Sequence, residues 1–134
     1  MKKTIVVVED HALIRDLWVK IYEGKGDVEV VGATGDFDEA MELITQLQPD
    51  IVSLDINLGD ASGADAVPLI RQNAPNTRVM AVSMHAQPKY LKQMMELGSM
   101  GYVTKSSPHA ELYKAIDEIC AGRVYICEEM KQYG

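Results

Sequence analysis

The sequence predicts an α/β protein built on a doubly wound parallel sheet, and two observations lead to this prediction. First, short apolar runs rich in β-branched residues alternate along the chain with amphipathic segments of helical spacing, and the alternation occurs five times. Second, strands that are separated by helices cannot pair as hairpins, so they pair in parallel through right-handed crossovers. We therefore expect a (βα)₅ fold with five parallel strands and helices on both faces of the sheet.

The first half of the chain supplies two strands and two helices. A continuous apolar run over 4–8 is typical of a strand that is covered on both faces. Apolar residues lie on one side of the segment 12–23, which glycines close, and a second strand follows over 28–33. Asp36, with a glutamate three residues later, starts a helix as a capping box does. This second helix ends before Pro49, because proline cannot continue it.

The second half repeats the alternation. A third strand is expected over 51–54, and Ser62 is expected to cap the third helix, in which Pro68 predicts a kink. The remaining expected elements are a strand over 79–82, a helix from Pro88 to Gly98, a strand over 100–103 and a helix from Ser107 to about Ala121. We expect residues 1–122 to form one domain and residues 123–134 to be a C-terminal tail or the start of a linker.

Composition excludes several classes of protein. With 134 residues and 47% apolar residues, the chain can bury the core of one domain without disulfide or metal staples. No apolar run approaches the roughly 20 residues of a membrane span. The net charge of −7 argues against binding of nucleic acid or anionic lipid by this chain alone. The two cysteines have no metal-ligand spacing, and we expect them to be reduced in the cytoplasm.

Polar side chains follow four of the five expected strands. Glu9 and Asp10 come after the first strand, Asp55 after the third, Ser83 after the fourth and Lys105 after the fifth. Ligands of open parallel sheets bind outside the carboxyl ends of the strands, which all lie at one rim. These five side chains are therefore the candidate functional site, although a single aspartate at a strand end is more often only a turn or cap residue.

The chemistry of this set points to phosphoryl transfer with a metal ion. Two carboxylates about 4 Å apart repel each other by about 4 kcal/mol at an effective dielectric constant of about 20, so three of them favour a bound cation. Oxygen ligands without histidine or cysteine suit Mg²⁺, with Mn²⁺ as the alternative ion. A carboxylate such as that of Asp55 can be the nucleophile that forms an aspartyl phosphate. Lys105 and Ser83 can then hold the phosphoryl oxygens.

The order and spacing of these residues resemble the receiver domain of bacterial two-component response regulators over residues 3–122. The matching segments are E-D-H at 9–11, P-D-I-V-S-L-D-I-N-L at 49–58 with Gly63 after it, S-M-H at 83–85 and G-Y-V-T-K at 101–105. The segment A-I-D-E-I-C-A-G-R-V-Y at 115–125 is similar to the LuxR/NarL-type subfamily, whose receivers precede a helix-turn-helix DNA-binding domain. The resemblance implies a flavodoxin-like fold with strand order 2-1-3-4-5.

The resemblance also implies a phosphorylation-activated switch rather than an enzyme that turns over a separate substrate. A sensor histidine kinase or a phosphotransfer protein would donate the phosphoryl group to Asp55, and the domain itself would hydrolyse the aspartyl phosphate. Mg²⁺ would be held by Glu9, Asp10, Asp55 and the backbone carbonyl of Asn57. Asn57 and His85 would tune the lifetime of the phosphoryl group, and His85 has the equally weighted alternative of an ordinary loop histidine.

The switch implied by the resemblance involves two further roles. Ser83 would move toward the phosphoryl oxygens and leave space for Tyr102, which repacks the face formed by the fourth helix, the fifth strand and the fifth helix. The implied partners are a second copy of the chain upon phosphorylation and DNA through an effector domain that is absent from this sequence. No membrane partner is expected. We expect a piece of a longer regulator, with a single-domain regulator as the alternative.

Three other functions remain as alternatives at this point. A receiver-like binding module that is never phosphorylated would use the same fold. A phosphatase of the haloacid-dehalogenase type also uses Asp, Mg²⁺ and Lys, but it needs D-x-D after its first strand, whereas D-I-N here follows the third. A flavodoxin-like electron carrier needs a phosphate-binding loop where this chain has Glu9 and Asp10.

Overall fold

The computed structural model describes residues 2–58, 61–84 and 86–133. Its central sheet has six parallel strands in the order β2-β1-β3-β6-β7-β8. These strands are β1 (Lys3–Val8), β2 (Val28–Thr34), β3 (Ile51–Asp55), β6 (Arg78–Ser83), β7 (Gly101–Thr104) and β8 (Tyr125–Ile126). The predicted fold class and the order of its five strands are confirmed, and the structure adds β8 at the edge next to β7.

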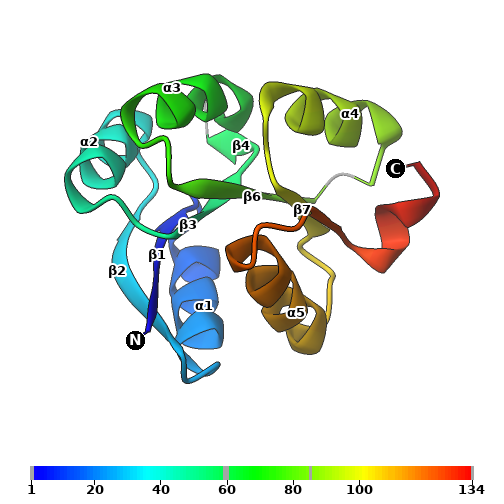
Figure 1. The fold of residues 1–134 in the computed structure, drawn as a ribbon, viewed down its shortest axis with the longest axis horizontal. Coiled ribbons are helices and arrows are strands. Elements are labelled where there is room, and N and C mark those ends of the chain that lie inside the picture. The colour runs from blue at the N-terminus through cyan, green and yellow to red at the C-terminus, as the bar shows by residue number, and fades with distance from the viewer. Residues whose placement is uncertain (1, 59–60, 85, 134) are drawn as a thin grey trace.

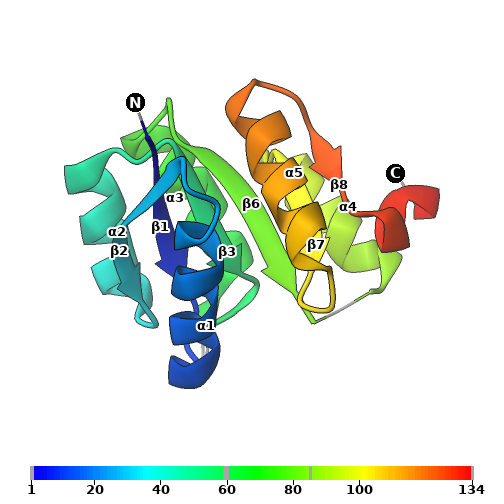
Figure 2. The same cartoon turned by 90° about the horizontal axis from the view of Figure 1, so that it is seen from below.

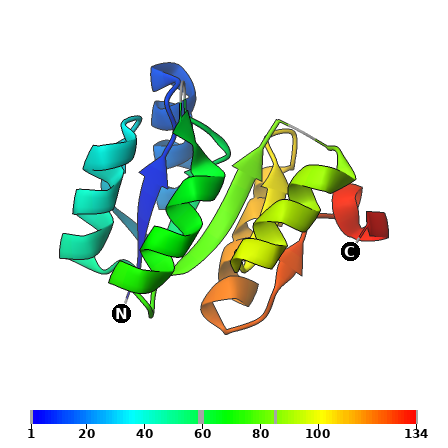
Figure 3. The same cartoon turned by 90° about the horizontal axis from the view of Figure 1, so that it is seen from above.

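Helices cover both faces of this sheet, as predicted. They are α1 (Ala12–Glu23), α2 (Phe37–Leu47), α3 (Ala66–Asn73), α4 (Pro88–Leu97) and α5 (His109–Cys120). Figure 1 shows α2, α3 and α4 on one face, with α1 and α5 on the other. Figure 2 looks onto the face of α1 and α5, and Figure 3 onto the opposite face. Within the described ranges, no helix has the length and apolar character needed to cross a lipid bilayer.

The helix starts follow local chemistry, with one correction to the sequence prediction. Asp36 caps α2 as expected, because its carboxylate accepts a hydrogen bond from the Glu39 backbone N–H at 2.8 Å. Ser62 caps a short 3₁₀ turn, η1 (Gly63–Asp65), and α3 begins only after this turn. The third helix therefore begins four residues later than Ser62, and Pro68 does not lie in its interior. Pro68 lies in the first turn of α3, where backbone N–H groups have no partner within the helix.

The core is centred on β1 and β3, which carry the first three acidic side chains of the site. All five residues of β3 are buried, as are the last four of β1. Tyr22 from α1 is fully buried against this layer, and its hydroxyl lies 2.7 Å from the Ser53 hydroxyl. The Trp18 ring stacks on Tyr22, with the ring centroids 6.0 Å apart. This packing fixes α1 against the strands whose ends form the site.

The C-terminal residues fold onto the domain. β8 pairs with β7 in parallel, and a 3₁₀ segment, η2 (Glu128–Tyr133), follows it. Cys127 and Met130 are fully buried, which anchors this segment. Figures 1 and 3 show it beside α4, at the edge of the sheet. Residues 125–133, expected to be a tail or the start of a linker, therefore pack as part of the folded domain.

Candidate functional site

The pairing of the strands brings the candidate side chains to one rim. Val8 at the end of β1 lies opposite Leu54 of β3, and Ser83 at the end of β6 lies opposite Thr104 of β7. Because these strands are parallel neighbours, the residues that follow them share the same edge of the sheet. Glu9, Asp10, Asp55, Ser83 and Lys105 all come from this edge.

Three carboxylates meet at the rim. One carboxylate oxygen from each of Glu9, Asp10 and Asp55 lies within 4.8 Å of the other two. Glu9 is 1% exposed and Asp55 is 4% exposed, whereas Asp10 faces solvent. The set thus has two buried acids at its base and one exposed acid at its mouth, an arrangement that burial alone makes unfavourable.

Lys105 supplies the positive charge that the two buried acids share. Its Nζ lies 2.5 Å from Glu9 Oε1 and 3.3 Å from Asp55 Oδ2. Burial by itself would lower the pKa of Lys105, but hydrogen bonds and charge attraction from Glu9 and Asp55 outweigh it and raise the pKa. Lys105 is therefore a fixed cation at the base of the site.

One ammonium group cannot neutralise two buried carboxylates. As a result, the pKa values of Asp55 and Glu9 shift in opposite directions. Burial raises the pKa of Asp55 to about 7, with the hydrogen bond to Glu9 and the negative charge of Glu9 adding to the rise. For Glu9 burial acts in the same direction, but hydrogen bonds from Lys105, Asp55 and the His11 backbone lower its pKa below the ordinary value. Near neutral pH the two carboxyl groups share a proton in the absence of another cation.

The residues present fit a divalent cation of the Mg²⁺ type. The donor atoms are carboxylate oxygens, which such hard ions prefer, and one positive charge is missing at the base of the site. Asn57, in the two-residue strand β4 (Asn57–Leu58), donates its backbone N–H to Asp55 Oδ1 at 3.1 Å and lies at the same hollow. This hollow has a volume of about 300 Å³ and is lined by Glu9, Asp10, His11, Ile14, Asp55, Asn57, Met84 and Lys105.

Ser83 and Tyr102 lie together below the rim. Ser83 is 1% exposed, and its carbonyl accepts a hydrogen bond from the Lys105 backbone N–H at 2.8 Å. Tyr102 is fully buried. Burial raises the pKa of its hydroxyl, and a hydrogen bond with the Ser83 side chain opposes that rise. Tyr102 is thus already buried, and its hydroxyl interacts with Ser83, in the domain without a phosphoryl group. His85 lies outside the described residues.

Sequence reasoning missed two residues that support the acidic pair, Arg15 and Gly35, and named Gly63 only for its resemblance. Arg15 on α1 donates from Nη1 to the Glu9 carbonyl at 2.9 Å. Gly35, after β2, packs so closely that an added Cβ would lie 2.8 Å from the Asp10 Cα. Gly63 is tighter still, because a Cβ there would collide with the Asp55 backbone carbonyl. A glycine after a strand and an arginine one helical turn beyond an acidic pair were the available signals.

This geometry agrees with what comparison with known proteins shows. A family model described as the response regulator receiver domain matches residues 5–117. The chain belongs to this family. Receiver domains are phosphoacceptor switches that generally bind Mg²⁺, and this chain carries a cluster of three carboxylates, those of Glu9, Asp10 and Asp55.

Relatives place this receiver domain among the LuxR/NarL-type regulators. The transcriptional regulatory protein MctR of Rhizobium johnstonii is 31% identical over 92% of this chain, and the oxygen regulatory protein NreC of Staphylococcus carnosus is 31% identical over 94%. The chain spans 58% of the length of each of these relatives.

Solved structures give the same assignment. A LuxR-family response regulator from Aurantimonas has a TM-score of 0.94 at 34% identity, covering 99% of this chain and 95% of that one. The receiver domain of NarL from Mycobacterium tuberculosis has a TM-score of 0.86 at 34% identity, covering 91% of this chain and 98% of that one.

Proposed function

We propose that this receiver domain accepts a phosphoryl group on Asp55 and thereby switches the face formed by α4, β7 and α5. The observation that carries the proposal is the position of Asp55, whose buried carboxylate lies beside Glu9 and the Lys105 ammonium at the base of an open hollow. A carboxylate with a fixed ammonium beside it is suited to attack a phosphoryl group that enters from the hollow.

Phosphoryl transfer to Asp55 exchanges one bond to phosphorus for another. One oxygen of Asp55 forms the new P–O bond as the P–N bond to a donor histidine breaks, and the donor imidazole keeps the electron pair of that bond. Asp55 must be ionised to act as the nucleophile, so it must first release the proton that its raised pKa favours. Hydrolysis later returns the carboxylate and inorganic phosphate, which ends the signal.

Each remaining residue has a role in this proposal. Glu9, Asp10, Asp55 and the backbone carbonyl of Asn57 would hold Mg²⁺, which when bound neutralises the charge of the phosphoryl oxygens. Lys105 exchanges its contacts with the two acids for one phosphoryl oxygen, and Ser83 donates its hydroxyl to another.

The switch then depends on Tyr102. When Ser83 turns toward the phosphoryl group, it gives up its hydrogen bond with the Tyr102 hydroxyl, and the inward ring must find another partner. Loss of this hydrogen bond would change the relative stability of the two arrangements of Tyr102 and so shift the balance between the two states of the domain. Asn57, two residues after Asp55, and His85, two residues after Ser83, would set how fast water reaches the aspartyl phosphate.

The partners follow from the family. A sensor histidine kinase or a phosphotransfer protein would supply the phosphoryl group. Since the relatives are transcriptional regulators that extend beyond this chain, the output would be DNA binding by an effector domain, with pairing of two copies upon phosphorylation.

Intact-mass spectrometry tests the central step. The wild type is incubated with acetyl phosphate, with and without Mg²⁺, beside Asp55→Ala. Asp38→Ala is the matched control, because Asp38 is an exposed aspartate in the first turn of α2, away from the site. We expect a gain of one phosphoryl mass that needs both Mg²⁺ and Asp55. A wild type that gains no mass and also binds no beryllofluoride would refute the proposal.

A further inference from the structure

Two glutamates hold the C-terminal segment, residues 124–133, to the rest of the domain. Glu111 on α5 accepts hydrogen bonds from the Tyr125 hydroxyl and from the Glu128 backbone N–H, both at 2.8 Å. Glu129 accepts a hydrogen bond from the Thr104 hydroxyl at 2.7 Å. The first contact fixes the segment on α5, whereas the second ties it to the strand that ends at the phosphorylation site.

The partner of Glu129 is the residue directly before Lys105. Thr104 is 2% exposed, and its hydroxyl also lies 3.1 Å from that of Ser106 and 3.2 Å from that of Ser107. The Ser107 backbone N–H closes the turn by donating to the Thr104 carbonyl at 3.0 Å. Glu129 thus accepts a hydrogen bond from Thr104, whose hydroxyl is the central one of the three hydroxyls in the turn that begins at Lys105.

The segment contacts the same strand at the switch residue. The Cys127 backbone N–H donates to the Tyr102 carbonyl at 3.0 Å, and Ile126 lies opposite Tyr102 in the β7–β8 pairing. Two of the β7 residues that the segment engages, Tyr102 and Thr104, are fully or almost fully buried. A movement of β7 would therefore disturb the hydrogen bonds that hold the segment, and release of the segment would remove contacts of β7.

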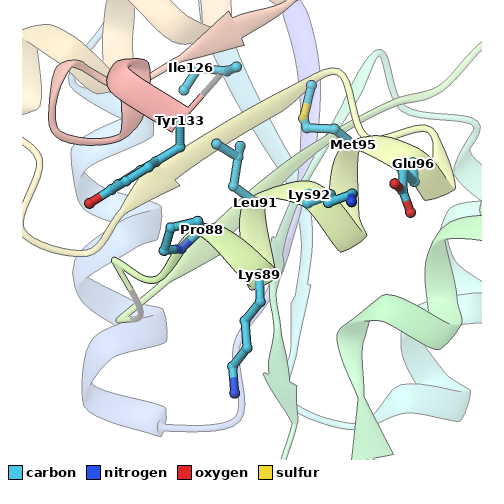
Figure 4. A pocket seen from close by; sticks show the side chains of 8 residues that line it. All are labelled: Pro88, Lys89, Leu91, Lys92, Met95, Glu96, Ile126 and Tyr133. Atoms are coloured by element: carbon cyan, nitrogen blue, oxygen red, sulfur yellow. The ribbon is translucent and has the colours of Figure 1, made fainter.

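The same segment also shapes the surface of α4. Ile126 and Tyr133 face Leu91 across a hollow of about 550 Å³ that α4 lines from the other side (Figure 4). A change in how the segment docks therefore alters the α4 surface as well as the Lys105 turn.

We propose that Glu129 is a positioning residue for the phosphorylation site, acting through Thr104 on Lys105. This inference rests on the proposed phosphorylation of Asp55. A turn that is already held in place leaves Lys105 less conformational freedom to lose when it binds a phosphoryl oxygen. Because coupling between two sites is reciprocal, occupancy of the phosphorylation site also strengthens docking of residues 124–133.

The test measures binding of beryllofluoride, in excess Mg²⁺, by isothermal calorimetry. Glu129→Ala should weaken binding about three- to fivefold, the scale of one partly exposed hydrogen bond to a charged group. Glu129→Gln keeps an acceptor oxygen and should recover most of the affinity. Glu128→Gln is the matched control: it removes the same charge one residue away, where the carboxylate only pairs with Lys131 at the surface. It should bind as the wild type does.

A mutant cycle separates positioning from general stability. Glu129 also accepts a longer hydrogen bond from the Ser106 hydroxyl, at 3.4 Å. In a Thr104→Val, Ser106→Ala background both contacts are already lost, so adding Glu129→Ala should weaken beryllofluoride binding no further. In hydrogen exchange, beryllofluoride should slow the Cys127 and Met130 amides in the wild type and less so in Glu129→Ala.

The outcomes also separate this inference from the proposed function. If the wild type binds beryllofluoride and Glu129→Ala binds it equally well, the positioning role is refuted while the phosphoacceptor role stands. Tighter binding by both Glu129 variants would show that Glu129 acts only through its charge, which also refutes the role. A wild type that binds no beryllofluoride refutes both.

Discussion

Replacing Asp55 by asparagine measures how strongly the site disfavours its own negative charge. The pKa of Asp55 rises from its ordinary value of 3.8 to about 7, and the side chain is 4% exposed. At 1.36 kcal/mol for each tenfold change in acidity, full ionisation of Asp55 costs the folded state about 4 kcal/mol. Asparagine has nearly the same shape and no charge, so it removes this cost.

The sign of the pH dependence follows from the direction of the shift. Since the folded state binds the Asp55 proton more tightly than the unfolded chain does, the contribution of Asp55 to the stability of the wild type falls as the pH rises from about 4 to about 7. The cost is about 2 kcal/mol at pH 5 and about 4 kcal/mol at pH 8, a difference of about 2 kcal/mol. The loss of one hydrogen bond in the variant offsets part of its gain at both pH values.

Urea unfolding of both proteins at pH 5 and pH 8, without divalent ions, is the assay. Relative to the wild type, Asp55→Asn should gain about 2 kcal/mol in unfolding free energy between these two pH values. Excess Mg²⁺ at pH 8 should stabilise the wild type more than the variant, because the ion supplies the missing positive charge. A stability difference that is the same at pH 5 and pH 8 would show that Asp55 is not buried as a costly charge.

Three further substitutions test other parts of the structure. Lys105→Met removes the cation between Glu9 and Asp55. We expect the free energy of urea unfolding to fall by about 3 kcal/mol at pH 8 and by less at pH 5. Equal losses at the two pH values would contradict the ion pairing. Gly63→Ala forces a Cβ against backbone and should cost about 2–4 kcal/mol in thermal unfolding, so an unchanged Tm would refute the close contact. Glu111→Ala should speed amide exchange in β8 and η2 while leaving β1 and β3 unchanged, and uniform exchange across the chain would count against local docking.

The parts of the fold that the sequence predicts are those that depend on local pattern. Five strand–helix repeats determine a parallel sheet, and the parallel arrangement places Asp55 and Lys105 at one rim even though 50 residues separate them. The effect of Pro68 depends on where α3 begins. Ser62 caps a 3₁₀ turn, and α3 itself begins only at Ala66. A proline in a first turn and one in a helix interior look alike until the start of the helix is known.

The contacts of the C-terminal segment could not be predicted in the same way. β8 has only two residues, too few to show a strand pattern, and its formation depends on a free edge on β7. Glu129 reaches Thr104 across 25 residues of chain, with no spacing rule to connect them. The raised pKa of Asp55 likewise depends on burial and on the short distance between side chains, which residue order does not supply.

The short strand β8 also bears on how copies of this chain meet one another. Without it, β7 would be the outermost strand, and its unpaired N–H and C=O groups would be a template onto which a foreign strand could add. With it, the outermost strand is two residues long, and 3₁₀ structure follows at once. Release of residues 124–133 would therefore expose the backbone N–H and C=O groups of β7, so the docking of this segment also protects the domain against unwanted strand addition.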